Sequence, residues 1–370
     1  MTMALITSID KLPPALAASV SPEEKNYIAE IQQRACSLGH ACSMNVPFAV
    51  TPHFASLARP EKDDPIRRQF FPDPREALPD PFALDDPLGA YRYQAAPALI
   101  HQYRDRALLL AANTCAGYCR HCFRRVWLSG QNGAKRDFEL EMAYLAAHPE
   151  IREIIVSGGD PLTLDNAALE DLFRRLRTAR PGVLLRVGTR IPITDPLRLD
   201  SETIALFAAS RPLRLVVHIN HPRELSAPAG AALSACVNAG IPVHVQTVLM
   251  RGINDDAALL AQLFRDCLDA GLSPYYLFQM DLAPGTAHFR VPLKQGLAIY
   301  RALSELISSQ GLRRRPGLRR RPALPAYAVD LPGGGGKMRL HEHSIINEKA
   351  AENVYVLKDK NGGEWYYPKE

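Results

Sequence analysis

The chain has 370 residues, of which 47% are hydrophobic and 22% are charged, and its formal net charge is +5. This composition is that of a globular protein with a large buried core, which excludes an intrinsically disordered chain. A net charge this small over this length does not favour a polyanionic partner, and no run of 18 apolar residues predicts a membrane-spanning helix.

The N-terminal quarter is rich in proline and acidic residues and predicts one clear helix, from Ser21 to about Leu38. Ser21 suits the N-cap, and Glu24 three residues later completes a capping box. The first residues do not resemble a signal peptide, and the seven cysteines are odd in number and unevenly spaced. We therefore expect a mainly helical wrap over residues 1–95 and a cytoplasmic protein without a disulfide framework.

From about residue 105, short β-branched runs alternate with longer amphipathic segments. Six successive β-α units imply a parallel sheet with right-handed crossovers. We predict an α/β fold, a partial (β/α)6 TIM-like barrel over residues 96–322, with an open doubly wound sheet as the alternative. The predicted strands are 107–112, 153–157, 184–188, 214–219, 243–250 and 275–280, and the helices lie near 137–148, 166–178, 201–209, 227–239, 256–270 and 293–309.

The C-terminal part begins with the most basic segment of the chain, LRRRPGLRRRP at 312–322. No aromatic residue interleaves with its arginines, so we interpret it as a solvated loop, with a subunit contact or an anion site as alternatives. Residues 323–370 form a C-terminal tail. Within it, 354–357 and 364–367 flank Lys-Asn-Gly-Gly and predict a hairpin that serves as a lid or an oligomer contact.

Three cysteines, Cys115, Cys119 and Cys122, form a C-x3-C-x2-C motif directly after the first predicted strand. Active sites of parallel barrels lie at the C-terminal ends of their strands. Thiolates this close in sequence can converge on one soft metal centre, whereas structural zinc commonly takes four ligands from two separated pairs. Three thiolates on a four-iron cluster would leave one iron open to another ligand.

The cysteine motif belongs to a longer series of segments. In chain order they read DRALLLAANTCAGYCRHCFRR, IIVSGGDPL, HINHP, VLMRGINDD, PYYLFQMDLAPGTAHFRVP and DLPGGGGK. From about residue 96 to 340, this series resembles the lysine 2,3-aminomutase family of radical S-adenosylmethionine enzymes. The resemblance implies an isomerase that moves the α-amino group of an amino acid to the β-carbon and uses pyridoxal 5′-phosphate as a further cofactor.

The resemblance also implies roles for the residues that match the family's motifs. The three cysteines would ligate a [4Fe–4S] cluster, and its open iron would bind S-adenosyl-L-methionine, which one-electron reduction cleaves to a 5′-deoxyadenosyl radical. Taken alone, the glycines among the matching residues also suit a strand-end turn, and the histidine suits a hydrogen-bonded place in the barrel. The residues that match the S-adenosylmethionine contacts are Ser157, Gly158, Gly159, Asp160, His218 and Gln246.

Lys337 follows four glycines, but the segment is not a Walker phosphate loop, because Leu331 stands six residues earlier and Met338 follows. The resemblance implies that Lys337 forms an imine with pyridoxal phosphate, for which a lysine amine is chemically suited.

Arg106 resembles the family's phosphate-binding arginine. The family often has a second arginine at the position of Gln102, where this chain departs from the pattern, and Arg104 lies close enough in sequence to substitute.

Three residues bear on the substrate. Arg124 resembles the arginine that pairs with the substrate carboxylate, for which a planar guanidinium is suited. Asp281 and Asp330 match the partners of a lysine ε-ammonium, and two carboxylates favour a cationic substrate. The resemblance therefore implies L-lysine as substrate and β-lysine as product.

Several alternatives stay open at this point. The same chemistry could act on arginine or glutamate, or the chain could belong to the branch that supplies β-lysine for elongation factor P. A metal-binding nucleic-acid module is the alternative from another class. The resemblance further implies a flavodoxin- or ferredoxin-like electron donor, a homo-oligomer, and neither nucleic acid nor membrane as partner. Because no cysteine follows Cys267, a C-terminal zinc site of some relatives is expected to be absent.

Overall fold

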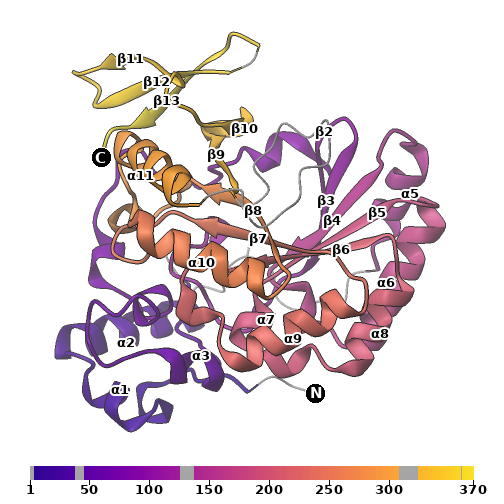
Figure 1. The fold of residues 1–370 in the computed structure, drawn as a ribbon, viewed down its shortest axis with the longest axis horizontal. Helices are drawn as coiled ribbons and strands as arrows, with labels where there is room; N and C mark the ends of the chain where they lie inside the picture. The colour runs from indigo at the N-terminus through magenta and orange to yellow at the C-terminus, as the bar shows by residue number, and fades with distance from the viewer. Residues whose placement is uncertain (1–3, 38–45, 126–136, 308–323, 360) are drawn as a thin grey trace.

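The computed structural model of the chain describes residues 4–37, 46–125, 137–307, 324–359 and 361–370 (Figure 1). The basic segment at 312–322 lies outside these residues. Within them, a ten-stranded sheet runs from β1 to β10 with its strands side by side in sequence order. Every helix in the described part of the chain is too short or too polar to span a bilayer.

The strands from β3 to β9 are each parallel to their neighbours. Because their order in the sheet follows the sequence, right-handed crossovers place the connecting helices on one face, as in a barrel and unlike a doubly wound sheet. The predicted partial barrel is confirmed, and β9 extends it past residue 322. The strands are β3 (Arg106–Ala112), β4 (Glu153–Gly158), β5 (Leu184–Thr189), β6 (Leu213–His218), β7 (Val243–Val248), β8 (Ser273–Phe278) and β9 (Ala326–Leu331).

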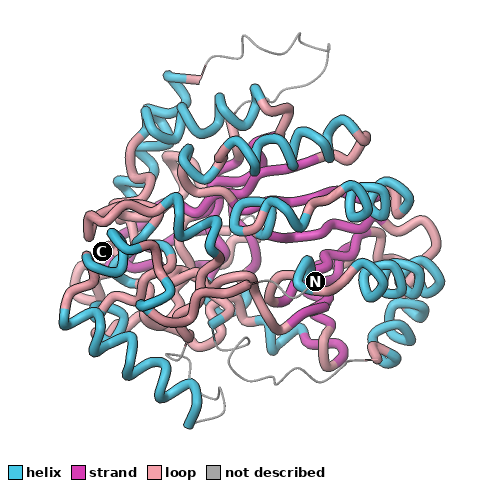
Figure 2. Tube along the Cα trace, turned by 90° about the horizontal axis from the view of Figure 1, so that it is seen from below, coloured by secondary structure: helices cyan, strands magenta, loops and turns pink. Residues whose placement is uncertain are grey.

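Helices cover the outer face of this sheet, as Figures 1 and 2 show. In α6, Leu169, Leu172 and Leu176 recur at helical spacing and are buried. The side chain of Asp165 caps this helix by accepting from the backbone N–H of Ala168 at 2.8 Å. The helices of the barrel are α5 (Glu139–Ala147), α6 (Asn166–Ala179), α7 (Ile191–Thr194), α8 (Ser201–Ala209), α9 (Ala227–Asn238), α10 (Ala257–Asp269) and α11 (Leu293–Leu306).

The N-terminal region wraps one side of the barrel with α1 (Pro14–Ala18), α2 (Pro22–Ser37) and α3 (Pro52–Leu57). The predicted helix is α2, and its capping box is present. The side chain of Glu24 accepts from Ser21 N at 2.8 Å, and Ser21 Oγ accepts from Glu24 N at 3.2 Å. α3 packs against α7, which joins this region to the barrel.

The C-terminal part adds β10 (Gly336–Arg339), which pairs antiparallel with β9, and a separate three-stranded sheet. That sheet contains β11 (Ile345–Lys349), β12 (Val354–Lys358) and β13 (Glu364–Pro368). The predicted hairpin is confirmed as the antiparallel pair β12–β13, in which Val356 faces Tyr366.

The two ends of the ten-stranded sheet approach each other at a seam. Its first strands are β1 (Gln94–Ala96) and β2 (Leu99–Tyr103), and they meet the glycine-rich segment before β10. Gln102 Nε2 and Tyr93 Oη donate to the carbonyl oxygen of Gly334 at 3.2 and 2.8 Å. Tyr103 Oη accepts from the backbone N–H of Lys337 at 2.9 Å. Side chains thus bridge the first and last parts of the barrel wall.

Candidate active site

One pocket, which reaches along the barrel strands to their C-terminal ends, gathers every site residue that the sequence predicts. They come from the first residue of β3 and the loop after it, from the end of β4 and the loop after it, from β6 and β7, from the loop after β8, and from β9 and β10. The predicted residues that line it are Cys115, Cys119, Cys122, Arg106, Arg124, Ser157, Gly158, Gly159, Asp160, His218, Gln246, Asp281, Asp330 and Lys337.

Buried charges anchor the cysteine loop to the N-terminal region. Arg120 donates to the two carboxylate oxygens of Glu76 from Nε at 2.8 Å and from Nη2 at 2.5 Å. Arg125 reaches the same carboxylate at 2.6 Å, and all three side chains are at most 2% exposed. Because Arg120 and Arg125 flank Cys122, one glutamate fixes the chain on both sides of this cysteine.

Glycines allow the segment after β4 to lie against the chain that leads into the cysteine loop. Gly159 N donates to Ala112 O at 2.6 Å, and Asp160 N donates to Thr114 O at 2.8 Å. A Cβ atom on Gly159 would lie 2.2 Å from Thr114 O, and one on Gly158 would lie 2.2 Å from Ala112 O. Gly158 also has φ +117°, which favours glycine. The two glycines therefore couple the Ser157–Asp160 segment to the cysteine loop.

The carboxylate of Asp160 is directed at the end of β5. It accepts from Thr189 Oγ1 at 2.7 Å and from the backbone N–H groups of Arg190 and Ile191 at 2.7 and 3.1 Å. It also caps the following 3-10 turn through Leu162 N at 3.0 Å. The Asp160 side chain thus ties the ends of two neighbouring strands together.

The surroundings of the three thiols fit a cationic iron centre. Burial raises the pKa of Cys122 to about 11 and that of Cys115 well above its usual value, and Cys119 adds to both shifts while Arg124 opposes them. A thiolate in this pocket therefore needs a positive partner, which a cluster supplies. The described residues contain no group of three or more His, Cys, Asp or Glu side chains arranged around a single ion. Thiolates of a four-iron cluster bind different irons, so they need not converge on one point.

His218 and Gln246, which the resemblance assigns to S-adenosylmethionine, lie side by side because they are register partners in β6 and β7. His218 Nε2 lies 2.9 Å from Asn220 Oδ1. Burial, together with the charge of Arg190, lowers the pKa of His218 to about 3, so this imidazole is neutral. A neutral ring that lines the pocket can hydrogen-bond or stack on a ligand without adding charge.

Lys337 lies among acidic and aromatic side chains. Its Nζ is 2.7 Å from Asp330 Oδ2 and lies 4.0 and 5.3 Å from the ring centroids of Phe278 and Tyr276. Burial, together with the charge of Asp330, raises the pKa of Asp281 to about 8. Lys337 thus shows that a cation fits here beside Asp330 and over two aromatic faces, with Asp281 nearby.

Arginines supply the anion partners of the pocket. Arg106 lies in it and stacks over Tyr103 at 4.4 Å. Gln102 also lines it, but its amide holds the glycine segment, while Arg104 is exposed and does not line it. Arg186 on β5 also lines the pocket, and it pairs with Glu153 at 2.8 Å.

Arg124 lines the pocket two residues after Cys122. Its Nη1 donates to Ser157 Oγ at 3.1 Å and to Gly158 O at 3.2 Å. The charges of Cys122, Cys115, Asp281 and Asp330 all act on this guanidinium, although burial is the larger influence and lowers its pKa. Arg124 therefore lies between the cysteines and the two aspartates.

Sequence reasoning missed several residues of the site. Glu76, Gln69 and Glu224 come from distant segments, and nothing in their local sequence marks them. Arg190 was also missed, although it directly follows a barrel strand at its C-terminal end, which is a signal for a site residue.

Comparison with known proteins agrees with this geometry. The sequence pattern of the radical SAM superfamily matches residues 109–263, which include the cysteine motif and the strands β4 to β7. Fold and site thus define a radical S-adenosylmethionine enzyme.

Relatives define the family more closely. A protein of Treponema pallidum named "Putative L-lysine 2,3-aminomutase" is 43% identical over 85% of this chain and 87% of its own length. L-Lysine 2,3-aminomutase of Bacillus subtilis is 34% identical over 87% of this chain and 66% of its own length. Glutamate 2,3-aminomutase of Clostridioides difficile is 31% identical over 93% of this chain and 76% of its own length. The chain belongs to the lysine 2,3-aminomutase family, whose members are isomerases that use a [4Fe–4S] cluster, S-adenosylmethionine and pyridoxal phosphate.

Proposed function

We propose that the chain converts L-lysine to β-lysine by moving the α-amino group to the β-carbon. The observation that carries this proposal is the acidic and aromatic environment of Lys337. Its ammonium lies 2.7 Å from Asp330 and over Phe278, beside Asp281. In the loaded enzyme Lys337 would bind pyridoxal phosphate, and the ε-ammonium of the substrate would take this place between the aspartates.

The remaining residues fit the same orientation of the substrate. Arg124 can pair with the substrate carboxylate on the side of the cysteines, while the aspartates hold the distal ammonium. Cys115, Cys119 and Cys122 would hold the cluster, with Ser157–Asp160, His218 and Gln246 around S-adenosylmethionine. Lys337 and Arg106 would bind pyridoxal phosphate, with Arg186 as a further cation in the pocket. The bound cofactors supply a substrate radical and its delocalisation, and the chain orients the substrate and excludes water.

Glutamate is the alternative substrate that the relatives raise. The side-chain carboxylate of a glutamate substrate would lie beside that of Asp330, and like charges repel. The arrangement of carboxylates therefore favours lysine.

The test is anaerobic turnover of the reconstituted full chain with lysine, arginine and glutamate offered separately, with β-amino acids measured by mass spectrometry. β-Lysine alone supports the proposal, and turnover of arginine or glutamate in its place refutes it. Asp281→Asn and Asp330→Asn should each lower kcat/KM for lysine by roughly tenfold to a hundredfold, the value of one charged hydrogen bond. Asp171→Asn, at an exposed ion pair on α6, serves as the matched control.

For the partners, we propose a low-potential flavodoxin- or ferredoxin-like electron donor, a homo-oligomer, and no nucleic acid or membrane. A reducing cytoplasm suits a chain whose cysteines 115, 119, 122, 236 and 267 are all free. Reduction assays with a flavodoxin and with a ferredoxin test the electron donor, and analytical ultracentrifugation tests the homo-oligomer.

A further inference from the structure

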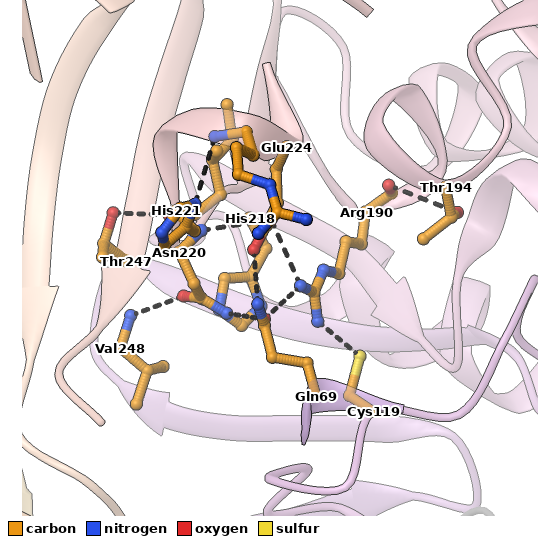
Figure 3. A network of polar contacts seen from close by, with 12 residues as sticks. Gln69, Cys119, Arg190, Thr194, His218, Asn220, His221, Glu224, Thr247 and Val248 are labelled. Atoms are coloured by element: carbon orange, nitrogen blue, oxygen red, sulfur yellow. Dashed lines mark hydrogen bonds and ion pairs between the residues drawn. The ribbon is translucent and has the colours of Figure 1, made fainter. Parts of the chain in front are cut away.

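Arg190 is a buried arginine beside one cysteine of the motif. It directly follows β5, and only 7% of its surface is exposed. Its Nη1 donates to Cys119 Sγ at 2.9 Å, and its Nη2 donates to Gln69 Oε1 at 2.5 Å and lies 3.2 Å from Glu224 Oε2 (Figure 3). The proposed reaction gives this side chain no contact with the amino acid, so its position requires another explanation.

The guanidinium of Arg190 is held from several sides. It lies over the rings of Phe54 and Phe70, with 5.4 and 5.1 Å between its central carbon and the ring centroids. Its backbone N–H is fixed by Asp160 at 2.7 Å. An arginine held against two adjacent rings and beside a carboxylate keeps its orientation, because its planar fork has few alternatives in such a space.

Gln69 belongs to the same network and is itself oriented. Its Nε2 donates to Glu224 Oε1 at 2.7 Å, and its Oε1 also accepts from Asn220 Nδ2 at 2.9 Å (Figure 3). Gln69 and Glu224 are fully buried. Gln69, like Phe54 and Phe70, comes from the N-terminal region, so that region determines where the positive charge of Arg190 lies.

A hydrogen bond to a cysteine sulfur changes the energetics of an iron–sulfur cluster. The reduction potential of a cluster depends on hydrogen bonds to its sulfurs and on the net charge around it. Reduction adds one negative charge to the cluster. A fixed positive charge in a buried place therefore stabilises the reduced state more than the oxidised state.

We propose that Arg190 is a positioning residue that raises the reduction potential of the iron–sulfur cluster through Cys119, and that the N-terminal region sets this potential by holding Arg190. The inference rests on the proposed cluster ligands. In the step concerned, one electron passes from an external low-potential donor to the cluster, and Arg190 neither gains nor loses a proton. The potential can be measured without substrate, so it is separate from lysine turnover.

The test compares Arg190→Gln and Glu224→Gln in the reconstituted full chain, titrated anaerobically with dithionite and followed by EPR. Arg190→Gln should lower the equilibrium constant for reduction of the cluster about tenfold. For a one-electron couple this is a downward shift of roughly 59 mV in the reduction potential. Glu224→Gln removes the negative charge that partly neutralises Arg190, so it should shift the potential upwards. Opposite shifts cannot arise from a general loosening of the site.

Arg290→Gln is the matched control, because Arg290 is 3% exposed, pairs with Asp80 at 2.5 Å and does not line the pocket. Its potential should equal that of the wild type. Iron and sulfide are measured first in every variant. A fully loaded Arg190→Gln chain with the wild-type potential overturns the inference, as do shifts of both variants in one direction. If Arg190→Gln loses its iron, the Glu224→Gln variant alone decides. A Glu224→Gln chain with the wild-type reduction potential then overturns the inference. A wild-type chain that binds no iron refutes the cluster ligands themselves.

Discussion

Lys337 and Asp330 are register partners in the antiparallel pair β9–β10, and their side chains form an ion pair with 2.7 Å between Nζ and Oδ2. The strand pairing itself therefore places the lysine beside the carboxylate that we assign to the substrate ammonium. If Lys337 holds pyridoxal phosphate as proposed, its amine would no longer pair with Asp330, and this carboxylate would be free for the substrate ammonium.

Replacing this lysine should remove pyridoxal phosphate. Lys337→Ala should lose the imine absorbance after incubation with pyridoxal phosphate, since no amine remains to bind the aldehyde. Borohydride reduction followed by mass spectrometry should locate the cofactor on Lys337 in the wild type. Lys294→Ala, which removes an exposed lysine paired with Glu348, is the control and should keep the label. A label elsewhere in the wild type would contradict the assignment.

The stability of the cofactor-free chain should depend on the ionisation of Asp281. An aspartate of the unfolded chain titrates near 4, whereas burial and then the charge of Asp330 raise the pKa of Asp281 to about 8 in the folded chain. Between these values the folded state holds a proton that the unfolded state has lost, so the free energy of unfolding falls as pH rises. Urea denaturation from about pH 4 to 8 measures this slope. Asp281→Asn should flatten it, and an unchanged slope would show that Asp281 does not titrate in this range.

The close approach at Gly159 should tolerate no side chain. Gly159→Ala places a Cβ atom 2.2 Å from Thr114 O, and relief requires the cysteine loop to move. We expect a loss of about 1–3 kcal/mol in the free energy of unfolding, as for overpacked cores, together with weaker S-adenosylmethionine binding. Gly230→Ala is the control in α9, where a Cβ would meet nothing within 4 Å, and it should be neutral or stabilising. Urea denaturation and calorimetric titration give the two readouts.

Glu76 should be essential for the cysteine loop. Glu76→Gln leaves Arg120 and Arg125 buried without their carboxylate, and breaking such a buried pair typically costs about 3–5 kcal/mol. Asp171→Asn breaks an exposed pair with Arg174 and should cost less than about 1 kcal/mol. Urea denaturation compares the two. Equal effects would mean that the Glu76 network does not stabilise the loop.

The sequence allowed the barrel to be predicted because its first six parallel strands are strongly apolar runs between capped helices. Val156 and Val187, for example, are fully buried and lie in strands predicted to within one residue of each end. β9 was not predicted. Its six residues follow the basic segment, and its pairing with β8 joins residues about 50 positions apart, Tyr276 with Ala326. β1 and β2 were missed because they are short, with three and five residues.

The site was predicted where a motif marks it and missed where only the fold assembles it. The cysteines, the glycine pair and Lys337 belong to contiguous segments with distinctive spacing. Gln69 and Glu224, by contrast, meet at 2.7 Å although 155 positions separate them. Contacts of this kind depend on tertiary packing, which local sequence does not specify.

The seam between β2 and β10 has a consequence for the assembly of the holoenzyme. Elsewhere the wall is joined by backbone hydrogen bonds between neighbouring strands, from β1 to β10. At the seam, Gln102, Tyr93 and Tyr103 provide separate side-chain bonds to the glycine segment and Lys337. A few such bonds can break while the backbone hydrogen bonds between strands stay intact. We therefore expect the seam to open more readily than the rest of the wall, and Lys337, the proposed attachment point of pyridoxal phosphate, lies beside it.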